Sequence, residues 1–273
     1  MHTEPSRISL ASRAALRMLL ITAGLMILCV PALAQTDEIQ VYDAEVVDPG
    51  IVNVMVHNNF IAIGHKEPAF LGAIVPNHSD NGAVEWAFGV KPWFEQGLYL
   101  PVYSLYSNGR GASVNGFKIR ELFVRPNSPE HKFAYGVNFE FSVNARYWEP
   151  RRISSEVRPI VVWHLARWDL IYNPIVDTDY TGGLRGLEFV PAGRIGYNIN
   201  KNWALSGEEY ADFGPLRDFL PAKQQFHEVW AVVNHAGKAV DVETGVGVGV
   251  TSGADKLTFK LMLSRNLNHR VKH

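Results

Sequence analysis

A strict two-residue alternation over residues 133–147 limits the folds open to this chain more than any other feature of its sequence. Because successive side chains of a β-strand point to opposite faces, the pattern predicts one strand of about 15 residues with an apolar and a polar face. Strands of soluble sheets usually have about 5 or 6 residues, whereas a tilted strand needs about 9 to 11 residues to cross a bilayer. The length therefore favours a membrane-crossing strand. Its apolar face consists of Phe133, Tyr135, Val137, Phe139, Phe141, Val143, Ala145 and Tyr147.

The same alternation recurs along the chain, most clearly over residues 240–251, where valines alternate with carboxylates and glycines. Such a strand suits lipid on one face and a polar interior on the other. No run of about 18 strongly apolar residues follows residue 34, so helical spans are excluded and a closed barrel is the remaining spanning structure. We predict an all-β fold, a closed antiparallel transmembrane β-barrel of about twelve strands. The expected strands are residues 39–47, 51–63, 83–91, 96–106, 112–125, 132–148, 156–170, 184–199, 202–212, 225–235, 238–251 and 255–267.

The first 34 residues have the pattern of a secretory signal peptide. Three arginines precede the uncharged apolar run from Met18 to Val30, and Pro31 with Ala32-Leu33-Ala34 supplies a cleavage site. An uncleaved anchor helix is the alternative, although the apolar run is shorter than the ~20 residues of a membrane span. We expect cleavage to leave residues 35–273 as one barrel domain in the outer membrane of a Gram-negative bacterium. The only cysteine, Cys29, precedes the cleavage site, so thiol chemistry is not expected.

Aromatic residues and charge support this prediction. Rings with one polar edge favour the headgroup layer, and a barrel collects them in two girdles; aromatics filling a soluble sandwich core are the alternative. The net charge of -1 does not indicate a nucleic-acid partner. No phosphate-binding loop is present, so no cofactor is expected. The aromatics expected at strand ends are Trp93, Phe94, Tyr147, Trp148, Trp168, Tyr172 and Trp203.

Several segments resemble a family of proteobacterial outer-membrane β-barrels, grouped as "MetA-pathway of phenol degradation" or outer-membrane transporter proteins. The resemblance covers nearly all of residues 35–273. It implies a barrel in the outer membrane and a channel-like activity, and it brings no catalytic residues. The segments that carry the resemblance are Ile39 to Glu45, His57 to Asn59, Glu85 to Val90, Trp93 to Glu95, Gly97 to Pro101 and Glu208 to Pro215.

A barrel of about twelve strands has room for a restricted channel. We expect passive transport of small solutes, hydrophobic and aromatic ones among them, with outer-membrane lipid, the solute and the barrel-assembly machinery as partners. Charges of both signs on the polar faces would tune selectivity in an open pore, or would pair with one another in a plugged barrel. The candidates for the lumen are Asn138, Glu140, Asn144, Arg146, Glu188, Arg194, Glu208, Asp212, Asp241 and Glu243.

Other functions stay open as alternatives. A lipid-modifying barrel enzyme would need a serine, a histidine and an acid in spatial contact, and His78-Ser79-Asp80 with His164 are the candidates. A non-conducting structural or binding barrel would use long loops such as residues 64–82 and 213–224. A metal site is not expected, because His227 and His235 are eight residues apart on one strand, about 26 Å.

Overall fold

The structure, a computed structural model, describes residues 38–106 and 111–268. The predicted signal peptide, residues 1–34, and the basic residues 269–273 lie outside the described residues. No helix in the described ranges is long and apolar enough to cross a membrane. The elements are β1 (Val52–Ile63), β2 (Asp80–Lys91), β3 (Phe94–Tyr106), β4 (Ser113–Val124), η1 (Ser128–Glu130), β5 (Phe133–Asn144), β6 (Ile153–Leu165), β7 (Trp168–Asn173), β8 (Val176–Thr178), η2 (Gly183–Gly186), β9 (Glu188–Phe189), β10 (Ala192–Asn200), β11 (Trp203–Asp212), β12 (Phe226–His235), β13 (Asp241–Gly249) and β14 (Leu257–Asn266).

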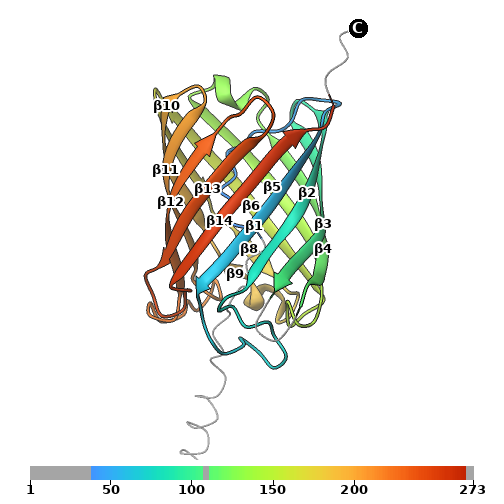
Figure 1. The fold of residues 1–273 in the computed structure, drawn as a ribbon, viewed down its shortest axis with the longest axis vertical. Coiled ribbons are helices and arrows are strands. Elements are labelled where there is room, and N and C mark those ends of the chain that lie inside the picture. Colours follow the sequence, from blue (N-terminus) through green and yellow to red (C-terminus); the bar gives the residue numbers. More distant parts are fainter. Residues whose placement is uncertain (1–37, 107–110, 269–273) are drawn as a thin grey trace, which may run out of the picture. The chain divides into compact units, whose positions relative to one another are not determined.

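The strands form one closed, antiparallel barrel of twelve wall positions (Figure 1). Each wall position pairs with the positions before and after it in sequence, and β1 pairs with β14 along most of its length, so that the first and last strands close the cylinder. Closure leaves no free strand edge in the wall, which is the condition for a β-structure in a bilayer. The predicted fold class and strand number are confirmed.

Two of the twelve wall positions are each built from two short strands. β6 pairs with β7 through residues 161–165 and with β8 through residues 155–157, and Pro174 lies in the gap between β7 and β8. Pro191 interrupts the next position in the same way, between β9 and β10. Proline has no N–H for the ladder, so each pair is one wall strand broken at a proline.

The two faces of the wall strands differ as the alternation predicts. On β5 the small and polar residues Ala134, Asn138 and Glu140 are at most 5% exposed, whereas Phe139 and Tyr135 are 44% and 54% exposed. The apolar face of β5 therefore points outward and its polar face points into the barrel. Because a strand repeats every two residues, one correctly assigned residue orients the whole strand.

Four strand predictions need correction. Residues 184–199 are not one strand, because residues 183–186 form η2 and Pro191 separates β9 from β10. Residues 39–47 are not a wall strand: residues 38–47 form no ladder with the wall. Residues 156–170 are not one strand, since β6 and β7 form a hairpin there, with Ala166 at φ 57 in its turn. Hairpin turns of this kind usually contain Gly or Asn, so an Ala-Arg turn gave no signal. β5 ends at Asn144, short of the predicted residue 148.

The connections at the two ends of the barrel differ in length. At the end where β1 begins, β6–β7 and β10–β11 are joined by two residues each, 166–167 and 201–202. At the opposite end the loops 64–79 and 213–225 are long. Bacterial barrels have short turns on one side of the membrane and long loops on the other, and this chain has the same asymmetry.

Candidate functional site

Residues 38–47 lie inside the barrel and precede β1 (Figure 1). Ile39, Val41 and Ala44 are at most 3% exposed, although these residues belong to no sheet. Their neighbours are inward-facing residues of the wall: Val41 and Ala44 pack with Leu122, Ile160 and Ile171, and Ile39 packs with Trp230 and Val232. We call residues 38–47 the inner segment.

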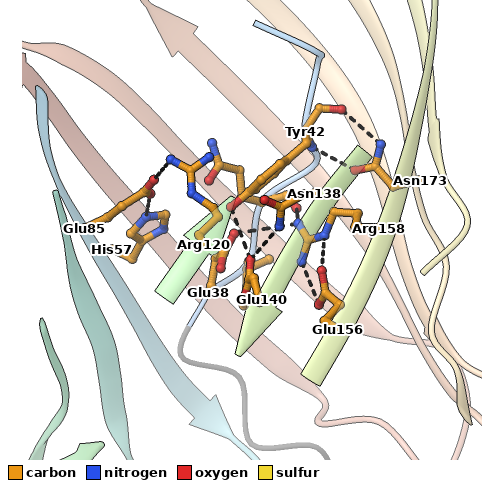
Figure 2. A network of polar contacts seen from close by, with 12 residues as sticks. Glu38, Tyr42, His57, Glu85, Arg120, Asn138, Glu140, Glu156, Arg158 and Asn173 are labelled. Atoms are coloured by element: carbon orange, nitrogen blue, oxygen red, sulfur yellow. Dashed lines mark hydrogen bonds and ion pairs between the residues drawn. The ribbon is translucent and has the colours of Figure 1, made fainter. Parts of the chain in front are cut away.

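The wall holds the inner segment mainly by its main chain. Asn173 accepts a hydrogen bond from the Tyr42 N–H at 2.8 Å and donates one to the Tyr42 carbonyl at 3.0 Å (Figure 2). Main-chain groups on both sides of Tyr42 are held in the same way by charged side chains. These contacts are Lys260 Nζ to the Ile39 carbonyl at 3.2 Å, Arg158 Nη1 to the Gln40 carbonyl at 3.2 Å, and the Val47 N–H to Glu95 Oε2 at 2.7 Å.

One side chain of the inner segment has a specific binding place. The Tyr42 ring lies between two guanidinium groups, with Arg158 Cζ at 4.4 Å and Arg120 Cζ at 5.5 Å from the ring centre (Figure 2). Its hydroxyl shares a hydrogen bond with the Tyr99 hydroxyl at 2.6 Å and donates to Glu140 at 3.5 Å. A desolvated cation over an aromatic ring is worth about 2 kcal/mol, so Tyr42 is an anchor of the segment.

A network of buried charges surrounds this anchor. Arg120 donates to Glu85 at 2.5 Å and to Glu95 at 2.6 Å, and His57 Nε2 contacts the other Glu85 oxygen at 3.0 Å. On the other side of Tyr42, Arg158 pairs with Glu156 at 2.6 Å. The inner segment adds Glu38, whose carboxylate is 3.7 Å from Arg158.

A second group of charges forms a closed ring on the opposite part of the wall. Lys260 Nζ lies 2.6 Å from both Glu208 and Glu243, and Arg194 lies 2.7 Å from the same two carboxylates. The Lys260 side chain is 0% exposed. Two buried cations and two buried carboxylates in alternation compensate one another, which the interior of a barrel requires. Lys260 also contacts the inner segment, so the ring supports it.

The chain turns from the inner segment into β1 at one end of the barrel, where its backbone packs closely against Gly89 of β2. The Gly50 N–H donates to the Gly89 carbonyl at 2.8 Å, and the Gly89 N–H donates to the Ile51 carbonyl at 3.0 Å. A Cβ at Gly89 would lie 2.2 Å from the carbonyl oxygen of Asp48. Gly50 has φ 84, which favours glycine. A residue without a side chain is therefore required at position 89, because a Cβ there would collide with the chain that enters β1.

The long-loop end is narrowed by two loop side chains. Ile74 and Trp148, each 2% exposed, pack with Ala83, Tyr99 and Val102 on the inner faces of β2 and β3. A main-chain hydrogen bond from Ile74 to the Tyr147 carbonyl joins the two loops. Trp148 is thus an interior residue, and its predicted place in an outer aromatic girdle is wrong.

The structure separates the ten lumen candidates into groups. Asn138 and Glu140 lie beside Tyr42, and Arg194, Glu208 and Glu243 form the charge ring. The others lie toward the barrel ends: Asn144 bonds Ser154, Asp212 caps the Gly214 N–H, Asp241 accepts from Gly237, Glu188 forms a bridge with Pro215, and Arg146 is exposed in the turn after β5.

Several residues of the lumen were not among the candidates. Glu85 and Lys260 carried a usable signal, because each occupies a polar position of a predicted alternating segment. Arg120 and Arg158 carried a weaker sequence signal, because the isoleucine, leucine and valine residues near them interrupt the alternation. The alternation predicts that Tyr42 lies in a wall strand, because period two does not distinguish a strand in the wall from an extended segment beside it.

The candidate residues for a lipid-modifying enzyme do not contact one another as a catalytic set; each has other partners. Ser79 is buried and accepts from Asn81 at 2.9 Å, Asp80 accepts from Asn58 at 2.8 Å, and His78 is exposed in a turn. His164 contacts Asp169 at 2.6 Å. Within residues 38–106 and 111–268, no three His, Cys, Asp or Glu side chains are grouped to hold a metal ion.

A closed twelve-stranded antiparallel barrel with an apolar exterior and a charged interior defines the class: this is the fold of outer-membrane β-barrels. No model of a protein family matches the chain, and no curated protein matches it either. Among solved structures it is similar to the COG4313 outer membrane channel from Pseudomonas putida F1, with TM-score 0.58, 12% identity, and coverage of 84% of this chain and 100% of that one.

Two porins have a similar fold. The NanC porin matches with TM-score 0.51 and 9% identity, covering 79% of this chain and 100% of its own. The KdgM porin, solved in complex with disordered oligogalacturonate, matches with TM-score 0.50 and 10% identity, covering 79% of this chain and 99% of its own. At these identities the similarity establishes the fold.

Proposed function

We propose that the protein is a passive channel of the outer membrane for small solutes, and that the inner segment closes it. The observation that carries the proposal is a polar lumen occupied by a segment outside the sheet, which can move without breaking the wall. The fold it shares with an outer membrane channel and two porins supports the proposal. We further propose that residues 1–34 are a cleaved signal peptide and that the barrel-assembly machinery inserts the chain.

The outer surface supports a place in the membrane. Trp93, Phe133, Trp168 and Trp203 lie at the short-turn end, and each is more than 40% exposed. Exposed aromatics at one level of a barrel are typical of the membrane interface. The short turns then face the periplasm and the long loops the exterior.

Phe139→Arg tests this placement. Phe139 lies near the middle of β5 and is 44% exposed on the outer face. An arginine at the bilayer midplane costs about 2–4 kcal/mol of folding free energy, so we expect a loss of that size in urea unfolding in lipid vesicles. Phe139→Leu is the control and removes the same contact with Phe123. Equal stability of the two variants would contradict a lipid-facing β5.

The charges around Tyr42 favour cations in the open pore. Four wall carboxylates lie there against three wall cations, and Glu38 leaves together with the inner segment. The carboxylates are Glu85, Glu95, Glu140 and Glu156, and the cations are Lys118, Arg120 and Arg158. The excess of one carboxylate over the cations favours cations. Small aromatic solutes also fit the proposal, because the space that Tyr42 leaves lies between two guanidinium groups.

Glu140→Gln tests both the channel and its selectivity. In the background of Ala44→Pro, which releases the inner segment, we expect steady conductance in planar bilayers and a cation preference reduced by Glu140→Gln. One charge about 4 Å from a passing ion is worth about 1 kcal/mol in water, or about fivefold in local concentration. Arg146→Gln is the control, because Arg146 is exposed in a turn outside the lumen wall.

Three results would count against the proposal. A barrel that stays silent after release of the inner segment would remove the channel function. An anion preference would contradict the charge count. An equal effect of Arg146→Gln would place selectivity at the barrel mouth.

A further inference from the structure

We propose that the lumen is a binding track for an extended peptide, and that a peptide added from solution can take the place of residues 38–47. The inference rests on the proposed function, because the track is reachable only when the inner segment leaves the pore. It names a solute class for this site: short, extended polypeptides with an aromatic residue. Oligopeptide uptake or peptide-mediated closure is the corresponding activity.

The contacts that hold the inner segment are directed at groups that every peptide has. Five main-chain atoms of residues 39–47 are hydrogen-bonded by four wall side chains that come from β3, β6, β7 and β14. Asn173, which is 0% exposed, contacts both the N–H and the carbonyl of one residue. A side-chain amide that bonds both main-chain groups mimics a neighbouring strand, the mode by which extended peptides are recognised.

Most side chains of the inner segment could be replaced by others without loss of binding. Ile39, Val41 and Ala44 fill apolar parts of the wall, which take any side chain of similar size. Asp43 Oδ1 accepts from the Glu45 N–H and so bonds within the segment. Tyr42 makes most of the directed contacts, to two guanidinium groups and, through its hydroxyl, to the Tyr99 hydroxyl and the Glu140 carboxylate; Glu38 adds an ion pair with Arg158. A ligand therefore needs one aromatic residue and an extended backbone that can bend at the position of Ala44, where φ is 62.

The covalent link to β1 explains why the track is filled in the intact chain. A segment tethered a few residues from its site has an effective concentration of about millimolar. A free peptide competes poorly against it. Once a backbone change prevents the tethered segment from binding, the same wall groups are available to a free peptide.

The experiment uses the full-length Ala44→Pro protein and a synthetic peptide of residues 38–47. We expect reversible block of its single-channel current by the peptide, and binding of a fluorescently labelled peptide by anisotropy in detergent. N-methylation at Tyr42 removes the N–H that donates a hydrogen bond to Asn173 and should weaken both the block and the binding roughly tenfold or more. Asn173→Ala in the barrel should weaken them similarly. A scrambled peptide and N-acetyl-tyrosinamide are the controls.

The outcomes separate this inference from the proposed function. If Ala44→Pro conducts and the peptide neither binds nor blocks, the track is wrong and the channel stands. If N-acetyl-tyrosinamide blocks the current as strongly as the peptide does, the site recognises an aromatic ring alone, and the inference of a peptide-binding track is wrong. If the barrel is silent but the labelled peptide binds with the expected loss on N-methylation, the track holds and the channel fails.

A second release variant keeps the test decisive if Ala44→Pro does not fold. Gly89→Ala places a Cβ 2.2 Å from the Asp48 carbonyl oxygen and so displaces the base of the inner segment. Gly207→Ala is its matched control, because a Cβ at Gly207 on β11 meets nothing within 4 Å. The peptide should bind Gly89→Ala and not Gly207→Ala. Equal binding to both would overturn the inference.

Discussion

Planar bilayers that contain Ala44→Pro are expected to carry a steady current where the natural sequence is mostly closed. Ala44 has φ 62, a left-handed backbone angle, in the middle of the inner segment. The proline ring fixes φ near −65°, and a proline in an incompatible backbone destabilises by more than about 1 kcal/mol. A change of that size shifts the equilibrium between bound and released segment at least about fivefold. The wall strands are unchanged, so the barrel should fold and open.

The matched substitution at the same position is Ala44→Gly. Glycine adopts positive φ without strain, so this variant keeps the inner segment in place and should conduct far less than Ala44→Pro. The measurement is open probability and mean current of refolded protein, with circular dichroism to check β-structure. Equal currents from the two variants would show that residues 38–47 do not close the lumen.

Lys260→Gln is expected to lower the stability of the barrel by about 3–5 kcal/mol, the cost of breaking a buried ion pair from one side. Lys260 is buried and lies 2.6 Å from both Glu208 and Glu243. Without it, Arg194 alone faces two buried carboxylates. The charge ring joins β10, β11, β13 and β14, so its loss should affect the whole wall. Urea unfolding in detergent, followed by tryptophan fluorescence, measures the change.

Lys91→Gln provides the control for the loss of one lysine. Lys91 is exposed at the end of β2, where a surface charge contributes about 0–1 kcal/mol. Because Lys260 also donates to the Ile39 carbonyl, Lys260→Gln should raise the open probability as well. A stability loss no greater than that of Lys91→Gln would show that the ring is compensated by other contacts.

The orientation of the wall was predictable because it depends on local periodicity. On β5 the positions of Asn138 and Glu140 relative to Phe139 follow from the alternation alone, and the structure places them accordingly. The same argument brought Arg194, Glu208 and Glu243 to the inner face. Which of these charges pair with one another was not predictable, because the partners lie on strands up to 49 residues apart in sequence.

The number of strands was predicted correctly through two errors that cancel. The alternation predicts one wall strand where the inner segment lies, and it predicts one strand where β6 and β7 form a hairpin. Both errors have one physical origin. Extended backbone and alternating side chains are local properties, whereas the partner of an extended segment is chosen by the rest of the chain.

By itself, the sequence determined that the chain forms long alternating strands with an apolar and a polar face, because the geometry of a strand has a period of two residues. Only the tertiary structure decided that residues 38–47 leave the wall and lie inside it. That choice depends on Asn173, Arg158, Lys260 and Glu95, which closure of the cylinder brings around one main chain. Contacts between residues 48 to 221 positions apart leave no trace in a local pattern.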